Sequence, residues 1–107
     1  MVKQYEIYWV SLDPTLGREI NTTRPYLVIS PDEANKYLST VLIAPITSTL
    51  RKFPMRMDIV LKRKKGQIAL DQIWCIDKLR LSNKMAALDK TEIKKLRLLL
   101  KEFLIDE

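Results

Sequence analysis

Five polar side chains stand at the ends of apolar, strand-like segments, and their types could do chemistry together. They are Glu19, Arg24, Thr47, Ser48 and Asp71. The carboxylates could accept a proton, the guanidinium could bind two phosphate oxygens at once, and the hydroxyls could donate hydrogen bonds to such oxygens. Side chains just outside core strands are held by a rigid scaffold while they face solvent. Proton transfer at a bound anionic group is therefore the chemistry open to this set.

Each of these residues also has an ordinary structural interpretation. Glu19 could be a solvated loop carboxylate, and Arg24 could extend along the mouth of a buried strand with its charge in water. Thr47 and Ser48 could satisfy their own backbone in a turn. Asp71 stands in an apolar run, where pairing with an arginine is the usual explanation for a carboxylate. Taken one at a time, the structural interpretations are favoured.

Composition narrows the possible chemistry. The chain has no histidine, which excludes Ser-His-Asp and Cys-His nucleophile pairs and histidine-bound metals. The single cysteine, Cys75, excludes a disulfide framework and a thiolate-built metal site. Any catalysis must therefore use carboxylate, arginine, lysine, tyrosine or hydroxyl groups. No cofactor is expected. The net charge of +6 is unevenly divided, with −1 in residues 1–50 and +7 in residues 51–107. Such an excess fits either a nucleic-acid partner or a solvated surface that keeps a small protein soluble.

The length of 107 residues is enough for one hydrophobic core and predicts a single domain over 1–107. No internal repeat or linker interrupts it. No apolar run approaches the roughly 18 residues needed to cross a bilayer, so neither export nor membrane insertion is indicated. We expect a cytoplasmic protein.

The elements that must position these side chains are mostly short strands. Pro45 should end one strand, and the basic run 62–66 should be a solvated turn. Residues 67–76 are expected to form a strand pair or one bent strand. Strands are predicted for 5–12, 24–29, 40–44, 54–61 and 67–76.

Two helices are predicted from their starts. The first should run to about residue 37, with Ser30 as its cap and Pro31 in the first helical position. The second, over 90–104, should begin with a capping box of Asp89 and Glu92. Its apolar face comprises Ile93, Leu96, Leu100, Phe103 and Leu104. These elements predict an α+β, mainly β fold: a compact barrel of antiparallel strands with short helices and a C-terminal helix.

Four segments, in order along the chain, resemble the successive motifs of the MazF/PemK (Kid) family of toxins. They cover residues 9–19, 24–31, 44–48 and 69–81. The resemblance implies an SH3-like, CcdB-like barrel that forms a homodimer and cuts single-stranded RNA at short sequences without a metal. It also implies a MazE-like antitoxin as partner, with any DNA contact made only through the antitoxin complex.

The resemblance also implies roles for the residues introduced above. Arg24 matches the arginine that stabilises the reacting phosphate and donates a proton, and Thr47 matches the catalytic threonine, with Ser48 beside it. Glu19 is the first candidate for the general base. Asp71 is the second, because PemK/Kid-type members use an aspartate there. RNA contacts are expected from Ser48, Thr23, Gln72 and Trp74.

This chain departs from the family pattern at three places. PemK/Kid-type members place an arginine acid two residues before the aspartate, where this chain has Ala69. Thr22-Thr23 replaces the usual Gly-Gly, which removes freedom to adopt positive φ. Trp74-Cys75 replaces Arg-Thr, and Trp74 could either stack on a base or pack in a dimer. The cleavage sequence therefore cannot be transferred.

Two other functions remain open from the sequence. CcdB-type poisons share the barrel and bind DNA gyrase without catalysis, but they depend on a C-terminal Trp-Gly-Ile, and this chain ends Leu-Ile-Asp-Glu. A barrel that binds nucleic acid without cutting it is the other alternative. The run Lys62–Lys65 could guide RNA, although a solvated hairpin tip is the favoured interpretation.

Overall fold

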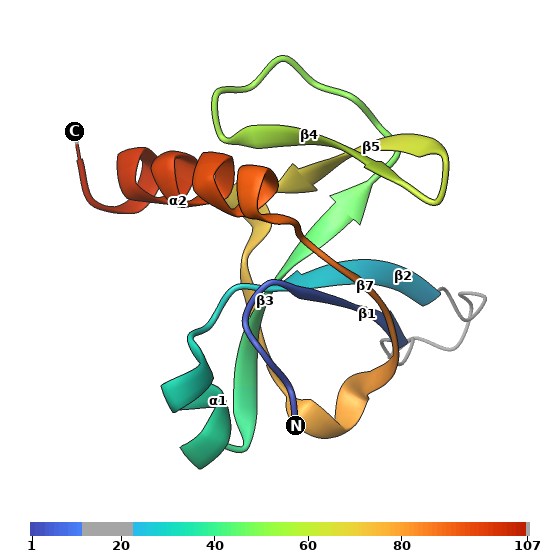
Figure 1. The fold of residues 1–107 in the computed structure, drawn as a ribbon, viewed down its shortest axis with the longest axis vertical. Coiled ribbons are helices and arrows are strands. Elements are labelled where there is room, and N and C mark those ends of the chain that lie inside the picture. Colours follow the sequence, from blue (N-terminus) through green and yellow to red (C-terminus); the bar gives the residue numbers. More distant parts are fainter. Residues whose placement is uncertain (12–22, 107) are drawn as a thin grey trace, which may run out of the picture.

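The computed structural model describes residues 1–11 and 23–106, and Figure 1 shows its elements in chain order. Within these ranges, no helix is long and apolar enough to span a membrane. The elements are β1 Glu6–Ser11, β2 Thr23–Val28, α1 Asp32–Tyr37, β3 Thr40–Thr47, β4 Arg56–Leu61, β5 Lys64–Ala69, the 3₁₀ turn η1 Leu70–Gln72, β6 Trp74–Asp77, the 3₁₀ turn η2 Lys78–Arg80, β7 Leu81–Ala87 and α2 Lys90–Leu104.

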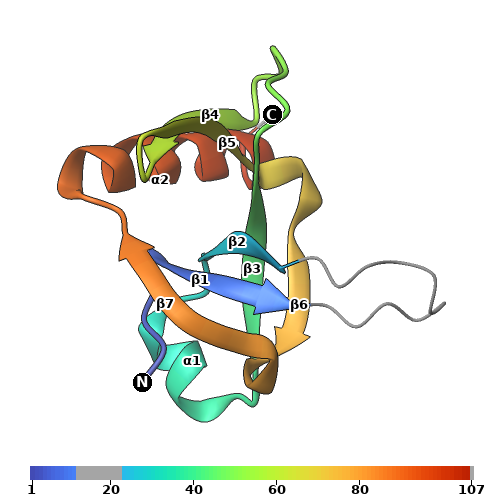
Figure 2. The ribbon, with the colours of Figure 1, turned by 90° about the vertical axis from the view of Figure 1, so that its right-hand side faces the viewer.

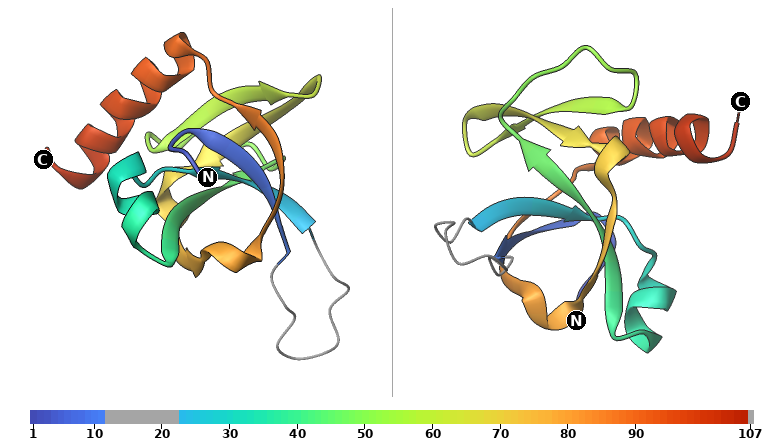
Figure 3. Two further views of the ribbon diagram at one scale, coloured as in Figure 1. Left: turned by 60° about the horizontal axis from the view of Figure 1, so that its bottom comes forward. Right: turned by 180° about the vertical axis from the view of Figure 1, so that it is seen from behind.

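The seven strands form one antiparallel sheet that curls into a half-barrel, as Figures 2 and 3 show. Its strand order is β4-β5-β3-β2-β1-β7, and β6 pairs with the first half of β3. The predicted mainly β fold with short helices and a C-terminal helix is confirmed. Because β3 pairs with β2, β5 and β6, it is the strand that joins the two halves of the sheet.

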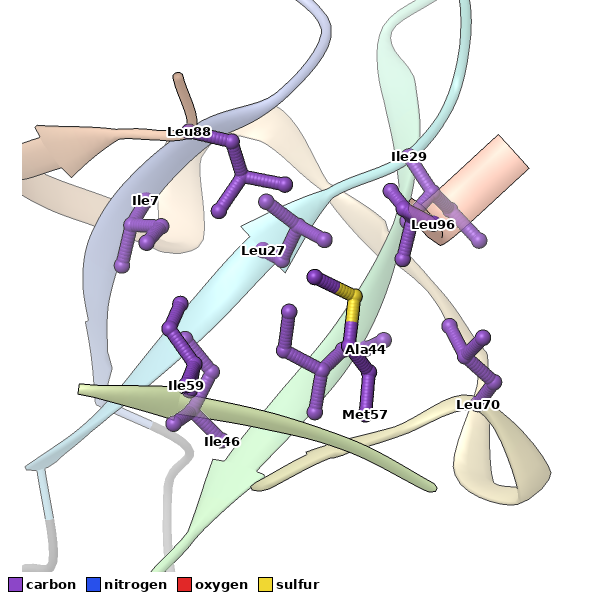
Figure 4. Packing of buried hydrophobic residues seen from close by; sticks show 11 residues of the cluster. Ile7, Leu27, Ile29, Ala44, Ile46, Met57, Ile59, Leu70, Leu88 and Leu96 are labelled. Carbon is purple, nitrogen blue, oxygen red and sulfur yellow. The ribbon is translucent and has the colours of Figure 1, made fainter. Parts of the chain in front are cut away.

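The apolar side chains of the strands meet inside the curl (Figure 4). Ile7, Leu27 and Ile68 are buried there, and Leu96 closes the same cluster from α2. A second, smaller cluster lies around Val10 and the first half of β3. Burying branched aliphatic side chains in this way is the main stabilising contribution to so small a domain.

Strand β3 continues through Pro45 to Thr47, so the prediction that Pro45 ends this strand is wrong. Pro45 pairs with Tyr26 of β2 on one side. On its other side, β3 changes partner at this point, from β6 up to Ile43 to β5 from Ile46 onward. The missing N–H of proline therefore falls where no ladder hydrogen bond is required.

The turn between β4 and β5 is shorter than the turn predicted over residues 62–66. Burial alternates along β4 as predicted, with Met57 and Ile59 inside. The turn itself is only Lys62 and Arg63, whose φ angles of 49° and 68° are positive. Positive φ at both central residues is the two-residue turn that matches the twist of antiparallel strands. Lys64 and the two residues after it belong to β5.

The first helix begins one residue later than predicted, and Ser30 does not cap it. Pro31 occupies the cap position without a side-chain hydrogen bond. The Ser30 hydroxyl instead donates to Oδ1 of the buried Asn35 at 2.5 Å and accepts from the N–H of Leu42 at 3.1 Å. The side chain therefore joins α1 to β3, because a tertiary partner competes for the hydroxyl.

The second helix matches its predicted bounds. Asp89 and Glu92 form the predicted capping box, with N···O distances of 2.8 and 2.9 Å. Leu96 is fully buried, but Phe103 and Leu104 are 42% and 57% exposed, so the core face covers only the first three turns. The helix therefore extends past the edge of the sheet that it covers.

Strand β7 was not predicted. It pairs along β1, and Lys84 Nζ lies 3.0 Å from Glu6 Oε2 across the pair. The register between β1 and β7 shifts twice, and most of the β7 side chains are exposed. A strand without regular alternation gives no period-2 signal in the sequence.

Candidate active site

A hollow of about 520 Å³ lies where β2 begins, β3 ends and the β4–β5 hairpin turns. Three separate parts of the chain meet there because β3 pairs with both β2 and β5. Its lining residues are Trp9, Arg24, Pro25, Ile46, Thr47, Ser48, Thr49, Leu61, Lys62, Lys64, Lys65, Gly66 and Met85. Three of the predicted site residues, Arg24, Thr47 and Ser48, are among them.

Arg24 is the second residue of β2 and pairs in register with Val10 of β1. It is exposed, and none of the described carboxylates forms an ion pair with its guanidinium. The strand therefore fixes the backbone of Arg24, and its guanidinium has no ion pair with a carboxylate of residues 1–11 or 23–106. A guanidinium that lines a hollow is suited to an anionic group such as phosphate.

Thr47 is the last residue of β3, and Ser48 follows it as an exposed residue. Thr47 Oγ1 accepts a hydrogen bond from the Thr49 N–H at 3.1 Å, so the turn-forming interpretation of Thr47 is confirmed. This bond uses a lone pair and leaves the hydroxyl proton free. The turn therefore orients the oxygen, and the hydroxyl can still donate to a ligand in the hollow.

Gly66 on the neighbouring strand sets the position of Thr47. A Cβ atom at Gly66 would lie 3.1 Å from the carbonyl oxygen of Thr47. Only a residue without a side chain lets β5 approach β3 this closely without displacing that backbone. The sequence predicted Gly66 in a solvated turn, so this role was missed. A lone glycine in a strand-forming segment was the signal that could have indicated it.

Three lysines of the hairpin, Lys62, Lys64 and Lys65, line the same hollow as Arg24. They are exposed, so they are solvated as expected, but they also form one wall of the candidate site. The local cationic density comes from two segments that are about 40 residues apart in the sequence. Such a concentration of positive charge favours a polyanion over a neutral ligand.

Asp71 lies in η1, outside the lining of the hollow. Arg56 binds it in a bidentate pair, with Nε···Oδ1 at 2.6 Å and a second N···O distance of 3.0 Å. The hydrogen bonds from Arg56 hold the pKa of the Asp71 carboxyl below its usual value and raise the pKa of Arg56. The pairing expected for this aspartate is therefore present. Because Arg56 stands opposite Ala69 in the β4–β5 register, a neighbouring strand supplies the guanidinium near Asp71.

The remaining predicted residues do not gather at the hollow. Gln72 is exposed in η1, and Thr23 is exposed directly before Arg24. Trp74 is 48% exposed on β6, where it pairs with Ile43 at the other half of β3. Glu19 lies outside the described residues.

An aromatic side chain does line the hollow, and it is Trp9 rather than Trp74. Trp9 is half-buried on β1, directly opposite Pro25 in the register with β2. Its indole could stack on a nucleobase next to a phosphate held by Arg24. The sequence showed a tryptophan in an aromatic strand but not which face of the sheet it would occupy.

No group of three or more acidic, histidine or cysteine side chains within residues 1–11 and 23–106 is arranged to hold a metal ion. The described hollow instead concentrates Arg24, hydroxyl groups and lysines. Such donors bind anionic oxygen directly.

The protein is a small, mainly β domain whose curled antiparallel sheet carries a hollow lined by cationic and hydroxyl side chains. The family model described as "PemK-like, MazF-like toxin of type II toxin-antitoxin system" matches residues 3–104, so the chain belongs to this toxin family. The resemblance stated from the four sequence motifs is therefore confirmed.

Individual relatives agree with the family assignment. The chain is 37% identical over 95 residues to endoribonuclease EndoA from Bacillus subtilis, with 83% of this chain and 82% of the relative covered. The fold is similar to Mycobacterium tuberculosis toxin MazF-mt6, with a TM-score of 0.76, 19% identity and coverage of 91% and 93%. It is also similar to a chain of a MazE-MazF structure from Deinococcus radiodurans, with a TM-score of 0.80, 23% identity and coverage of 96% and 95%.

Proposed function

We propose that this chain is an endoribonuclease that cleaves single-stranded RNA at short sequences without a metal. The observation that carries the proposal is the hollow, where Arg24, Thr47 and three lysines surround one space. The B. subtilis relative is named an endoribonuclease, which supports the same activity here. Because guanidinium and ammonium groups supply the positive charge, phosphate binding needs no cation from outside the protein.

The proposed reaction begins with the 2′-OH of one nucleotide. Its oxygen attacks the adjacent phosphorus while its proton passes to a carboxylate. The new O2′–P bond forms as the P–O5′ bond breaks, and the departing 5′-oxygen takes a proton. The products are a 2′,3′-cyclic phosphate and a 5′-hydroxyl.

Each group in the hollow has a place in this scheme. Arg24 binds the phosphoryl oxygens, stabilises the charge that develops on them and donates the proton to the leaving oxygen. Thr47 and Ser48 donate hydrogen bonds to the same oxygens. A single donor of this kind typically accounts for about 100–1,000-fold in rate. Trp9 stacks on a base beside the scissile phosphate.

Glu19 is the base in this proposal. The ion pair between Asp71 and Arg56 supports this choice, because it lowers the pKa of Asp71 and occupies both carboxylate oxygens. A carboxylate so stabilised is a weaker proton acceptor. Asp71 then serves to hold η1 against β4.

The test is cleavage of a mixed-sequence single-stranded RNA in EDTA by wild type and Arg24→Ala. We expect discrete cuts with cyclic-phosphate and 5′-hydroxyl ends, and a loss of at least about 100-fold in the variant. Arg97→Ala, which removes an exposed arginine from α2 away from the hollow, should cleave like wild type. Equal cleavage by folded Arg24→Ala would overturn the site, and the absence of cuts by wild type would overturn the activity and favour a binding function such as that of gyrase poisons.

We also propose that the chain acts as a homodimer in the cytoplasm and is held inactive by a MazE-like antitoxin. The similar D. radiodurans structure is one of MazE-MazF, which supports an antitoxin partner. In this proposal any contact with DNA is made through the antitoxin complex.

The exposed apolar residues near β3 and β6 support dimerisation there. Leu42 and Trp74 are 40% and 48% exposed, and Cys75 pairs with Leu42 across the strands. Tyr37 and Leu38, just before β3, are also exposed. Leu42 and Cys75 lie opposite each other in the register and are both exposed, so they share one face of the sheet. Exposed apolar groups of this kind favour an interface.

Sedimentation velocity tests the dimer. Leu42→Glu should yield monomers, because a charge would be buried without a partner. Val60→Glu is the matched control, since Val60 is equally apolar and 64% exposed on β4. The dimer surface is wrong if both variants sediment like wild type.

A further inference from the structure

A second hollow, of about 660 Å³, runs between α2 and the N-terminal segment. None of its lining residues is shared with the candidate active site. Figures 1 and 3 show α2 on one flank of the sheet and the β4–β5 turn on the other. The lining residues of this α2 groove are Gln4, Tyr5, Lys90, Ile93, Lys94, Arg97, Leu98, Leu100 and Lys101.

Four cations of α2 form one stripe along this groove. Lys90, Lys94, Arg97 and Lys101 are spaced by four, three and four residues, which places them on one face of a helix. All four are exposed, and none forms an ion pair with a described carboxylate. The helix carries two glutamates: Glu92 accepts a hydrogen bond from the Asp89 N–H at the helix start, and Glu102 does not line the groove. The stripe is therefore a row of cations without an ion pair to any carboxylate of the described residues.

Apolar side chains lie beside the stripe. Leu98 lines the groove and is 57% exposed, and Ile105, seven residues later on the same side, is 73% exposed. Tyr5 and Ile93 are half-buried and line the groove between the cations and the body of the domain. The surface thus combines a cationic row with apolar contacts, and a nucleic-acid backbone would use only the former.

We propose that the α2 groove binds an acidic amphipathic segment of a partner protein. The carboxylates of such a segment would pair with the four cations, and its apolar residues would cover Leu98 and Ile105. Helices laid in grooves are recognised in this way, by apolar anchors at regular spacing and charges at the rim. The site is independent of the hollow at Arg24, so it can be occupied without blocking that hollow.

The experiment starts from a phage-displayed library of random 12-residue peptides selected on the full chain. Enriched peptides should be acidic with apolar residues three or four positions apart. Their affinity is then measured by fluorescence anisotropy for wild type and for the double variant Lys94→Glu/Arg97→Glu. We expect the double variant to bind at least tenfold more weakly and Leu98→Ser at least fivefold more weakly.

Lys95→Glu is the matched control, because Lys95 is exposed next to Lys94 but does not line the groove. It should change the affinity less than twofold. The proposal is overturned by selected peptides that are not acidic, or by peptides that bind the double variant as tightly as wild type. It is also overturned by an equal loss in Lys95→Glu, which would indicate unspecific charge attraction.

A single-stranded RNA of 12 nucleotides provides the comparison with nucleic acid. RNA binding should be the same in wild type and the double variant. Loss of RNA binding without loss of peptide binding would overturn the proposal in favour of a nucleic-acid surface. RNA cleavage and thermal unfolding of the variants, measured in parallel, should match wild type, so failure of the proposed RNase activity would be seen separately from failure of this site.

Discussion

Replacing the three hairpin lysines by alanine tests whether the wall of the hollow holds RNA. Lys62, Lys64 and Lys65 stand on the same hollow as Arg24, and all are exposed. Lys62 is one of the two turn residues, but alanine meets the same positive φ there as lysine, and none of the three side chains belongs to the core. The triple variant should therefore fold normally while it loses affinity for RNA and most of its response to salt.

The size of the effect follows from the number of cations around the hollow. Each phosphate neutralised on a single strand contributes about −0.7 to the slope of log affinity against log salt concentration. Arg24 and the three lysines together predict a slope of about −2.8, and Arg24 alone about −0.7. Between 50 and 200 mM salt, affinity should thus fall about 50-fold in wild type and about threefold in the triple variant.

The assay is fluorescence anisotropy with a labelled single-stranded RNA that carries 2′-O-methyl groups, because these block the attacking oxygen and prevent cleavage. Arg63→Ala is the control variant. Arg63 shares the turn with Lys62 but does not line the hollow, and both have positive φ. Its slope should equal that of wild type, whereas Lys64→Ala should reduce the slope by about 0.7.

A triple variant whose slope equals that of wild type would refute the reasoning, since RNA would then lie elsewhere on the surface. Equal changes in Arg63→Ala and Lys64→Ala would also refute it. In that case only the net charge of the hairpin would matter, and the wall of the hollow would have no specific part.

Two further predictions concern the supports of the site. Gly66→Ala places a Cβ 3.1 Å from the Thr47 carbonyl oxygen, so that backbone must give by a few tenths of an ångström. We expect the cleavage rate to fall on the order of tenfold with little change in RNA affinity, because small displacements of a reacting group are costly; an unchanged rate would show that Gly66 does not set the position of Thr47 for cleavage. Asp71 has a lowered pKa in the folded protein, so its pairing stabilises the fold above about pH 4 and is lost as the pH falls through that lowered pKa. Thermal unfolding from pH 2 to 6 should show this part of the acid destabilisation in wild type but not in Arg56→Ala, and parallel curves would contradict it.

Some features of this protein were determined by short stretches of sequence. The start of α2 follows from Asp89 and Glu92, whose side chains bond to the backbone three residues away and need no other part of the chain. The alternation along β4 follows from the pleat of a single strand. The family could also be predicted from the sequence, because the resemblance rests on four segments and their order along the chain.

Tertiary structure decided which side chains share a space. The pairing of Thr47 with Gln67 brings the β4–β5 hairpin beside the end of β3, and so places Lys64 near Arg24. Nothing in the local sequence distinguishes those lysines from a solvated turn. Tertiary pairing likewise brought Arg56 to Asp71 and placed Trp9, not Trp74, at the hollow.

The physical reason is the range of the interactions involved. Capping, pleating and turn formation depend on atoms within a few residues, so a short stretch of sequence is enough to predict them. Strand pairing between distant segments depends on burial of the whole core. Because of such tertiary contacts, Ser30 bonds to Asn35 instead of capping the helix, and β3 continues past Pro45. For this chain the sequence indicated the family and most of the elements, whereas strand β7 and the partners of the charged side chains depend on how distant strands pair.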